Sequence, residues 1–199
     1  MDLTIFHALN GLAVRHDGSV EDPMRFFAVE APVLFIVLLA GLFLAAGKLR
    51  SQSARHGVVA AGFSALLALG IAQILNHLWA RPRPYVAHPG DAHLFVPATH
   101  DTSFPSDHAT AAFAIAVAIA LRSRRAGWVA LALATLVAVS RVVVGTHYPS
   151  DVLAGAAIGT LSALVLYHPL VRGPLHRLAD AAGGIWDSLA RPLTGSGRA

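Results

Sequence analysis

The chain has 199 residues, of which 55% are hydrophobic and 13% are charged, and its formal net charge is +4. A soluble domain carries about 25% charged residues, so this composition argues against a soluble enzyme and favours one integral-membrane domain over the whole chain, residues 1–199. The absence of cysteine from the sequence excludes disulfide bonds and thiol chemistry.

The first predicted element is a helix near the N-terminus, where Leu3, Phe6, Leu9 and Leu12 form an apolar stripe at a spacing of three residues. Such a stripe is typical of a helix that lies in the membrane interface with its apolar face toward the lipid. We therefore expect residues 1–25 to form an interfacial N-terminal segment.

Five long apolar stretches follow, and each is a candidate for a transmembrane helix of about 20 residues. They lie at roughly residues 31–47, 58–78, 109–121, 126–144 and 152–171. The third is short unless the PSDH sequence before it also lies inside the membrane boundary. The expected fold class is therefore all-α, a polytopic membrane helical bundle of about five transmembrane helices plus the N-terminal interfacial helix.

The segment after the fifth stretch, residues 173–199, is expected to be a C-terminal tail. Within it, five apolar residues recur at helical spacing and allow a second amphipathic helix: Leu178, Ala182, Ile185, Trp186 and Leu189. After Leu193 we expect a frayed chain end.

Basic residues gather in three segments that fall on the same side of the predicted bundle. These are Lys48, Arg50 and Arg55 after the first stretch, Arg122, Arg124 and Arg125 after the third, and Arg172, Arg177, Arg191 and Arg198 after the fifth. By the positive-inside rule this side is cytoplasmic. The C-terminal tail is then cytoplasmic, and the loops that carry Arg83, His108 and His147 face the extracytoplasmic side of the cell membrane.

Those outer loops contain the residue types that a phosphate-ester site needs. Arg83 and Arg141 can hold phosphate oxygens with planar guanidinium forks. Ser106 is a natural N-cap at the start of a predicted helix, where free backbone N–H groups favour an anion. His147 and Asp151 are four residues apart, so the carboxylate could bond one imidazole nitrogen and leave the other as a nucleophile.

His108 would then serve as the general acid. Each motif also has a structural interpretation when taken alone: PSDH is a common helix cap, and the arginines could bind lipid headgroups. The three motifs fall on one face of the membrane, and this convergence favours a catalytic site.

The motifs resemble the signature of the type 2 phosphatidic acid phosphatase (PAP2) superfamily, which shares its site with vanadium haloperoxidases. That signature is K-x6-RP, PSGH and SR-x5-H-x3-D. Here Arg83 begins RP, residues 105–108 read PSDH, and residues 140–151 match the third motif in full. The resemblance implies a PAP2/haloperoxidase-like core and a metal-independent hydrolase with no cofactor.

The resemblance also implies a role for each matching residue. His147 would form a phosphohistidine, and Asp151 would orient it. His108 would protonate the leaving group and then activate water. Arg83, Ser106 and Arg141 would bind the phosphate.

Two positions depart from the family pattern. Asn76 stands where the signature has lysine, and Asp107 stands where it has glycine. Asparagine can donate a hydrogen bond to phosphate but brings no charge. We expect Arg81 to compensate by pointing toward the leaving phosphate of a diphosphate, or else to extend to lipid headgroups.

The PSDH form resembles the branch of bacterial undecaprenyl-diphosphate phosphatases, so the expected reaction is hydrolysis of undecaprenyl diphosphate to the monophosphate. Alternative substrates are phosphatidylglycerol phosphate, phosphatidic acid and decaprenyl-phosphoribose phosphate. An alternative of another class is a non-catalytic lipid-binding or transport protein. The expected partners are a lipid phosphate and membrane lipid, not nucleic acid, and the sequence leaves the oligomeric state open.

Three histidines in one outer loop, His88, His93 and His100, leave zinc binding as a minor alternative to a solvated loop or a lid.

Overall fold

The structure is a computed structural model that describes residues 1–16, 18–49 and 51–194, with the backbone alone for residues 189–194. Within these residues every regular element is helical. The helices are α1 (Asp2–Arg15), α2 (Glu21–Lys48), α3 (Gln52–Leu78), α4 (Pro84–Ala87), α5 (Asp107–Ala120), α6 (Arg124–Val143), α7 (Pro149–Tyr167) and α8 (Pro169–Thr194).

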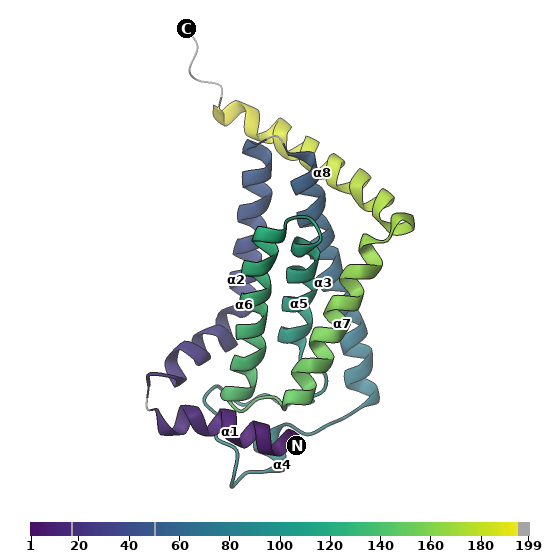
Figure 1. Cartoon of the computed structure of the whole chain (residues 1–199). Helices are drawn as coiled ribbons and strands as arrows, with labels where there is room; N and C mark the ends of the chain where they lie inside the picture. The colour runs from purple at the N-terminus through teal and green to yellow at the C-terminus, as the bar shows by residue number, and fades with distance from the viewer. Residues whose placement is uncertain (17, 50, 195–199) are drawn as a thin grey trace.

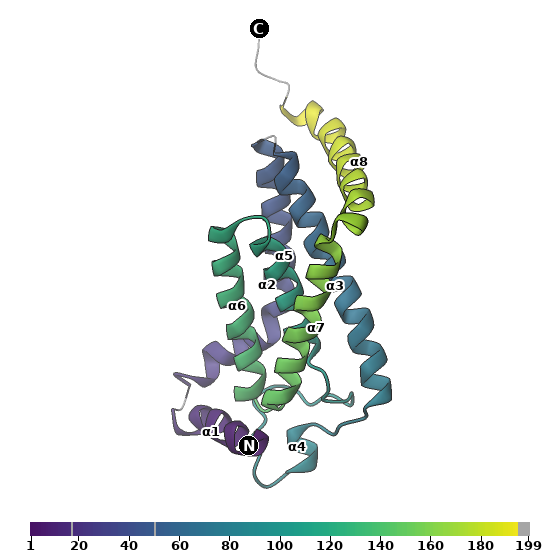
Figure 2. The same cartoon turned by 45° about the vertical axis from the view of Figure 1, so that its right-hand side comes forward.

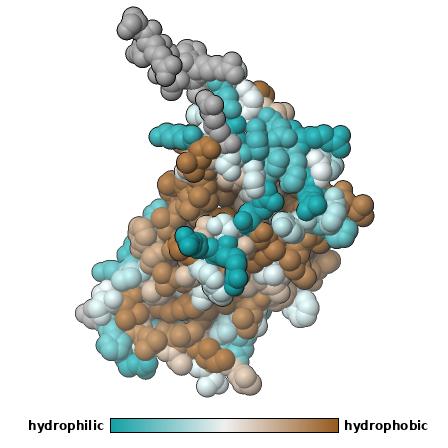
Figure 3. Space-filling view, turned by 45° about the horizontal axis from the view of Figure 1, so that its top comes forward, coloured by the Kyte–Doolittle hydropathy of each residue, from teal (hydrophilic) through white to brown (hydrophobic). Residues whose placement is uncertain are grey.

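Five of these helices, α2, α3, α5, α6 and α7, run side by side as a bundle (Figure 1). The helices α1 and α4 lie at one end of the bundle, which we call the α1 end, and α8 crosses the other, the α8 end (Figure 2). Among the described residues, α2, α3, α6 and α7 are long and apolar enough to cross a membrane. Figure 3 shows a broad apolar flank, with polar residues gathered near α8. The chain is therefore a multi-pass membrane protein.

The short third stretch forms α5, which has 14 residues and lies between α3, α6 and α7. Its small side chains allow close packing, and α7 meets it at two glycines. A Cβ at Gly155 would lie 2.7 Å from the Ser106 carbonyl oxygen, and one at Gly159 would lie 2.3 Å from the Thr110 carbonyl oxygen. Because protein rather than lipid surrounds α5, this helix does not need the length of a lipid-exposed span.

The helix α1 forms over the residues expected, but it packs through a different face. Phe6, Asn10 and Ala13 are its buried residues, whereas Leu3 and Leu12 are more than one-third exposed. A spacing of three drifts around a helix that has 3.6 residues per turn, so the predicted stripe cannot stay on one face. The buried residues follow i, i+4, i+7 and dock α1 against the protein.

The fifth apolar stretch ends earlier than expected, at Tyr167, because Pro169 disfavours helical backbone at His168 before it. The chain then turns into α8, which covers the C-terminal residues whose apolar spacing allowed a second helix and also extends to the start of the expected tail. The expected fraying after Leu193 falls almost wholly outside the described residues.

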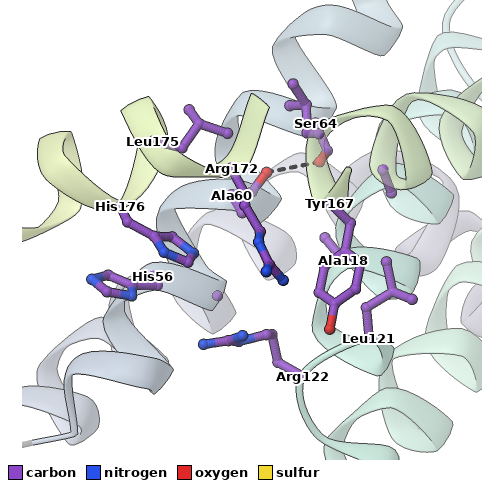
Figure 4. Close-up of a pocket in the computed structure, with 13 residues that line it drawn as sticks. His56, Ala60, Ser64, Ala118, Leu121, Arg122, Tyr167, Arg172, Leu175 and His176 are labelled. Carbon is purple, nitrogen blue, oxygen red and sulfur yellow. Dashed lines mark hydrogen bonds between the residues drawn. The ribbon is translucent and has the colours of Figure 1, made fainter. Parts of the chain in front are cut away.

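The contacts of α8 with α3 are polar. Arg55 donates to both oxygens of Asp187, at 2.8 and 2.5 Å, and His56 lies 2.6 Å from Asp180. The His56 and His176 rings are stacked with centroids 4.1 Å apart, and a small pocket opens beside them (Figure 4). These contacts fasten α8 across its end of the bundle.

Candidate active site

His147 lies in the short loop between α6 and α7. The loop turns at Gly145, whose φ of 84° and whose approach to the His93 carbonyl oxygen leave no room for a side chain. The backbone N–H groups of Thr146 and His147 then bond the Arg141 carbonyl oxygen, at 3.1 and 3.2 Å. As a result the imidazole of His147 is held inside the protein, with 2% of the residue exposed.

The two ring nitrogens of His147 have different partners. Nδ1 lies 2.8 Å from the Ser103 carbonyl oxygen, and Nε2 lies 3.4 Å from a terminal nitrogen of Arg83. A carbonyl oxygen can only accept, so Nδ1 carries the proton. The lone pair is therefore on Nε2, on the side of Arg83.

Asp151 lies in the first turn of α7 and is fully buried. One carboxylate oxygen accepts from the Ser103 hydroxyl at 2.5 Å and from the Tyr148 backbone N–H at 2.9 Å. That oxygen is 3.8 Å from Nδ1 of His147. The direct hydrogen bond that the spacing suggested is thus replaced by the Ser103 carbonyl, because Asp151 caps its own helix. Asp151 remains close enough to stabilise positive charge on His147.

The pKa of His147 is lowered to about 4, and burial is the largest cause. The charges of Arg141 and Arg83 contribute to this lowering, while the interaction with Asp151 opposes it. The imidazole is therefore neutral at pH 7, which is the form with an unprotonated Nε2.

Arg83 is nearly buried and is held by the loop that precedes α5. Its guanidinium donates to the Asp101 carboxylate at 2.8 Å and to the Thr146 carbonyl oxygen at 3.2 Å. Burial raises the pKa of Asp101, but the hydrogen bond with Thr99 and the charge of Arg83 lower it more, so the net pKa shift is downward. Asp101 was not predicted, and its carboxylate shares Arg83 with any phosphate that binds.

Two hydrogen-bond donors of the predicted phosphate site are buried without a partner within the described residues: the hydroxyl of Ser106 and Nε of Arg141. Ser106 is the N-cap of α5, yet its side chain does not cap the helix. Arg141 uses one terminal nitrogen on the Ala28 carbonyl oxygen, at 2.8 Å. Unpaired buried donors are costly, and a phosphate oxygen would satisfy them.

His108, in the first turn of α5, interacts electrostatically with Arg141, His147 and Arg83. The three sequence motifs are therefore brought together at the α1 end of the bundle. Asp107, beside His108, accepts from the Gln73 amide at 2.9 Å with one oxygen, and its other oxygen is buried without a partner among the described residues.

A groove runs from this cluster into the apolar part of the bundle. Its volume is about 890 Å³, and Asp107 and His108 line its polar end. The rest of the lining comes from α2, α3 and α5 and includes Phe35, Leu39, Phe63, Leu66 and Ile115. Such a surface suits an apolar chain attached to a phosphate.

Arg81 does not reach toward a leaving phosphate, and this corrects our expectation. Its guanidinium donates to Asp151 and to Asp2, both at 2.7 Å, and lies 3.8 Å from the centre of the Tyr148 ring. These partners are on the Nδ1 side of His147, away from Nε2. Two carboxylates and an aromatic face outcompete solvent for the cation.

Asn76, at the end of α3, is hydrogen-bonded to the Thr102 hydroxyl. Its amide therefore holds the loop before Ser103. Asparagine does not supply the positive charge that the family lysine would bring to this position.

Part of the loop that carries His88, His93 and His100 is bonded to α1. The backbone of His93 bonds both polar atoms of the Asn10 amide, at 2.8 and 2.9 Å. No group of three His, Cys, Asp or Glu side chains in the described ranges is placed to hold a metal ion.

Residues missed by the sequence interpretation are Ser103, Asp101 and Asp2. Ser103 contacts His147 through its backbone carbonyl. Every residue has this group, so the sequence gives no sign of the contact. The two acids lie outside the motifs, and no spacing links them to the site.

Comparisons with known proteins cover the same region. Residues 57–172 match the PAP2 superfamily, and this segment contains all nine predicted site residues. The chain is 33% identical to the undecaprenyl-diphosphatase BcrC of Bacillus subtilis over 195 residues, which cover 98% of this chain and 96% of that protein.

Two further proteins are similar over less of the sequence or at lower identity. Decaprenylphosphoryl-5-phosphoribose phosphatase of Mycobacterium tuberculosis is 39% identical over 113 residues, 56% of this chain and 60% of that protein. The crystal structure of Aquifex aeolicus LpxE superimposes with a TM-score of 0.63 at 27% identity, over 82% of this chain and 93% of that one.

Proposed function

We propose that this chain, which belongs to the PAP2 superfamily and is a membrane-embedded lipid phosphatase, hydrolyses undecaprenyl diphosphate to undecaprenyl monophosphate through a phosphohistidine. The observation that carries the chemistry is the arrangement around His147. Its Nδ1 is held by the Ser103 carbonyl, so Nε2 is unprotonated and its lone pair is directed toward Arg83.

In the first step Nε2 of His147 attacks the terminal phosphorus, and the bond from that phosphorus to the bridging oxygen breaks. His108 gives a proton to the bridging oxygen, which leaves as part of the lipid monophosphate. Arg83, Arg141 and the Ser106 hydroxyl hold the equatorial oxygens, where negative charge is spread in the transition state.

In the second step His108 takes a proton from a water molecule, which attacks the phosphohistidine and releases inorganic phosphate. Positive charge develops on His147 while the phosphorus–nitrogen bond exists. Asp151, 3.8 Å from Nδ1, is placed to stabilise that charge.

The choice of substrate is supported by similarity over nearly the full length of the chain to an undecaprenyl-diphosphatase. The apolar groove that begins at His108 is also suited to a long hydrocarbon chain. The similarity to a decaprenylphosphoryl-5-phosphoribose phosphatase makes that polyprenyl monoester the second candidate substrate.

The proposed orientation places the active site on the extracytoplasmic side. At the α8 end lie Lys48, Arg55, Arg122, Arg124, Arg125, Arg172 and Arg177. The positive-inside rule makes that end cytoplasmic, and the α1 end with His147 is then outside.

The test is phosphate release by purified enzyme in detergent from undecaprenyl diphosphate, phosphatidylglycerol phosphate, phosphatidic acid and decaprenyl-phosphoribose phosphate. The proposal expects the highest kcat/KM for undecaprenyl diphosphate. A higher kcat/KM for another lipid would make that lipid the substrate in place of undecaprenyl diphosphate. Binding of these lipids without phosphate release would favour the non-catalytic alternative.

A further inference from the structure

Asp2, at the start of α1, is joined to the catalytic region by a chain of polar contacts. One of its carboxylate oxygens accepts from Arg81 at 2.7 Å, and Arg81 in turn donates to Asp151 at 2.7 Å. Ser150 strengthens the link, because its backbone N–H and its hydroxyl bond the two Asp2 oxygens at 3.0 and 2.6 Å. Residues 148 positions apart in sequence are thus directly bonded.

The helix α1 holds Asp2 in this place through contacts farther along the helix. The Asn10 amide donates to the carbonyl oxygens of His93 and Val143, each at 2.8 Å, and accepts from the His93 N–H at 2.9 Å. Phe6 is fully buried, and its ring lies 5.9 Å from that of Tyr148. These contacts dock α1 against the loop that carries His147.

Asp2 is ionised at neutral pH. Partial burial raises the pKa of its carboxyl, but hydrogen bonds from Ser150 and Arg81 lower it more, so the net pKa shift is downward. Arg81 therefore faces two carboxylates of the same charge.

The summed charge of Asp2, Arg81 and Asp151 determines how strongly this group stabilises positive charge on His147. Alone, Arg81 would neutralise Asp151, since a guanidinium and a carboxylate at hydrogen-bond distance sum to zero. With Asp2 added, two negative charges and one positive charge leave a net charge of −1 beside Nδ1. A net negative charge stabilises the positive charge that His147 acquires as a phosphohistidine.

We infer that Asp2 is a positioning residue for the phosphatase reaction, which acts through Arg81 to keep the group around Asp151 negatively charged during phosphoryl transfer. This inference rests on the proposed role of His147 as nucleophile. Asp2 touches neither the phosphate nor the imidazole, and its effect is electrostatic.

The experiment compares kcat and KM of four variants in detergent on the lipid that the wild-type enzyme hydrolyses fastest. Asp2→Asn keeps the shape of the side chain but makes the group neutral, and kcat should fall about tenfold or more with KM unchanged within about twofold. Asp2→Glu keeps the charge and should retain most of kcat.

The deciding variant combines Asp2→Asn with Arg81→Gln, which restores a net charge of −1. It should recover a large part of the kcat that Asp2→Asn loses. If Asp2 only fastens α1, the second substitution breaks further contacts and kcat should fall again.

Asn10→Ala is the matched control, because it loosens α1 at three hydrogen bonds without changing any charge. It should lower the thermal unfolding midpoint, and its kcat should fall by less than the kcat of Asp2→Asn. A double variant slower than Asp2→Asn would overturn the inference.

Wild-type enzyme and His147→Ala are measured alongside to separate the two proposals. An active wild type, an inactive His147→Ala and an unaffected Asp2→Asn contradict the role of Asp2 alone. A fully active His147→Ala contradicts the proposed function, and with it the role of Asp2.

Discussion

Nδ1 of His147 lies 2.8 Å from the backbone carbonyl oxygen of Ser103, a residue 44 positions earlier in the chain. This contact sets the tautomer of the imidazole, and the carboxylate of Asp151 lies farther away, at 3.8 Å. Orientation and charge stabilisation of His147 are therefore supplied by two different groups. A side-chain substitution at Ser103 therefore leaves the carbonyl contact in place.

Substitutions at three residues should separate the roles around the nucleophile. His147→Ala should abolish phosphate release, and His108→Ala should lower kcat at least ~10²-fold, a typical loss for a general acid–base residue. Ser103→Ala keeps the carbonyl and removes only the 2.5 Å hydrogen bond to Asp151, so its loss should be smaller. Steady-state phosphate release measures all three, and full activity in either histidine variant would contradict the phosphohistidine scheme.

Protonation of His147 should make the folded state less stable in acid. Its pKa is about 4 in the protein and 6.5 for the free side chain, so between these values the unfolded chain binds more protons than the folded one. The stability that the folded state has with neutral His147 is fully present above pH 6.5, and it falls as the pH is lowered toward about 4.

The measurement is the thermal unfolding midpoint in detergent from pH 7 to pH 4, for wild type and for His147→Gln. Carboxylates such as Asp101 titrate in both proteins, so the difference between the two curves isolates His147. Parallel curves would show that His147 is not held neutral by burial.

The groove between α2, α3 and α5 should bind the hydrocarbon chain of the substrate. Gly62 lines the groove, and a Cβ at this position would meet no atom within 4 Å. Gly62→Trp should therefore fold and fill the groove, lowering kcat/KM for a long polyprenyl diphosphate more than for a short-chain analogue.

Gly70→Trp is the matched control for this experiment. Gly70 is also on α3 with open space around it, but it lies outside the groove lining. Equal losses for the two variants, or equal losses for long and short substrates, would argue against chain binding in the groove.

Close packing of α7 on α5 should be required for stability. A Cβ at Gly159 would lie 2.3 Å from the Thr110 carbonyl oxygen and 2.7 Å from the Ala114 nitrogen, both backbone atoms. Gly159→Ala should therefore destabilise the protein by about 1–3 kcal/mol, as overpacking does. Thermal unfolding against Gly70→Ala measures the effect, and equal midpoints for these two variants would contradict it.

The orientation in the membrane can be read from single cysteines, because the natural sequence has none. A cysteine at Gly90, in the loop at the α1 end, should react with an impermeant thiol reagent in intact cells. A cysteine at Ser123, between α5 and α6, should react only after the membrane is opened. The opposite pattern would place the active site in the cytoplasm.

Motif spacing and hydropathy alone predicted the helical membrane fold and most of the candidate site residues of this protein. Long apolar runs predicted the helices, because a chain in lipid must satisfy its backbone hydrogen bonds within each span. The motifs predicted Arg83, Ser106, His108, Arg141, His147 and Asp151 as site residues, because they match the family signature and supply the cations, nucleophile and proton donor that phosphate chemistry needs.

Only the tertiary structure decided how these side chains are joined. The Ser103 carbonyl carries no signal of residue type, and Asp2 reaches Ser150 across 148 residues because α1 docks through Phe6 and Asn10. The direction of Arg81 depends on two carboxylates that helix packing brings to either side of it. Spacing along a chain determines which residues share a helix face, but the approach of two helices depends on steric fit at places such as Gly159, which local sequence does not encode.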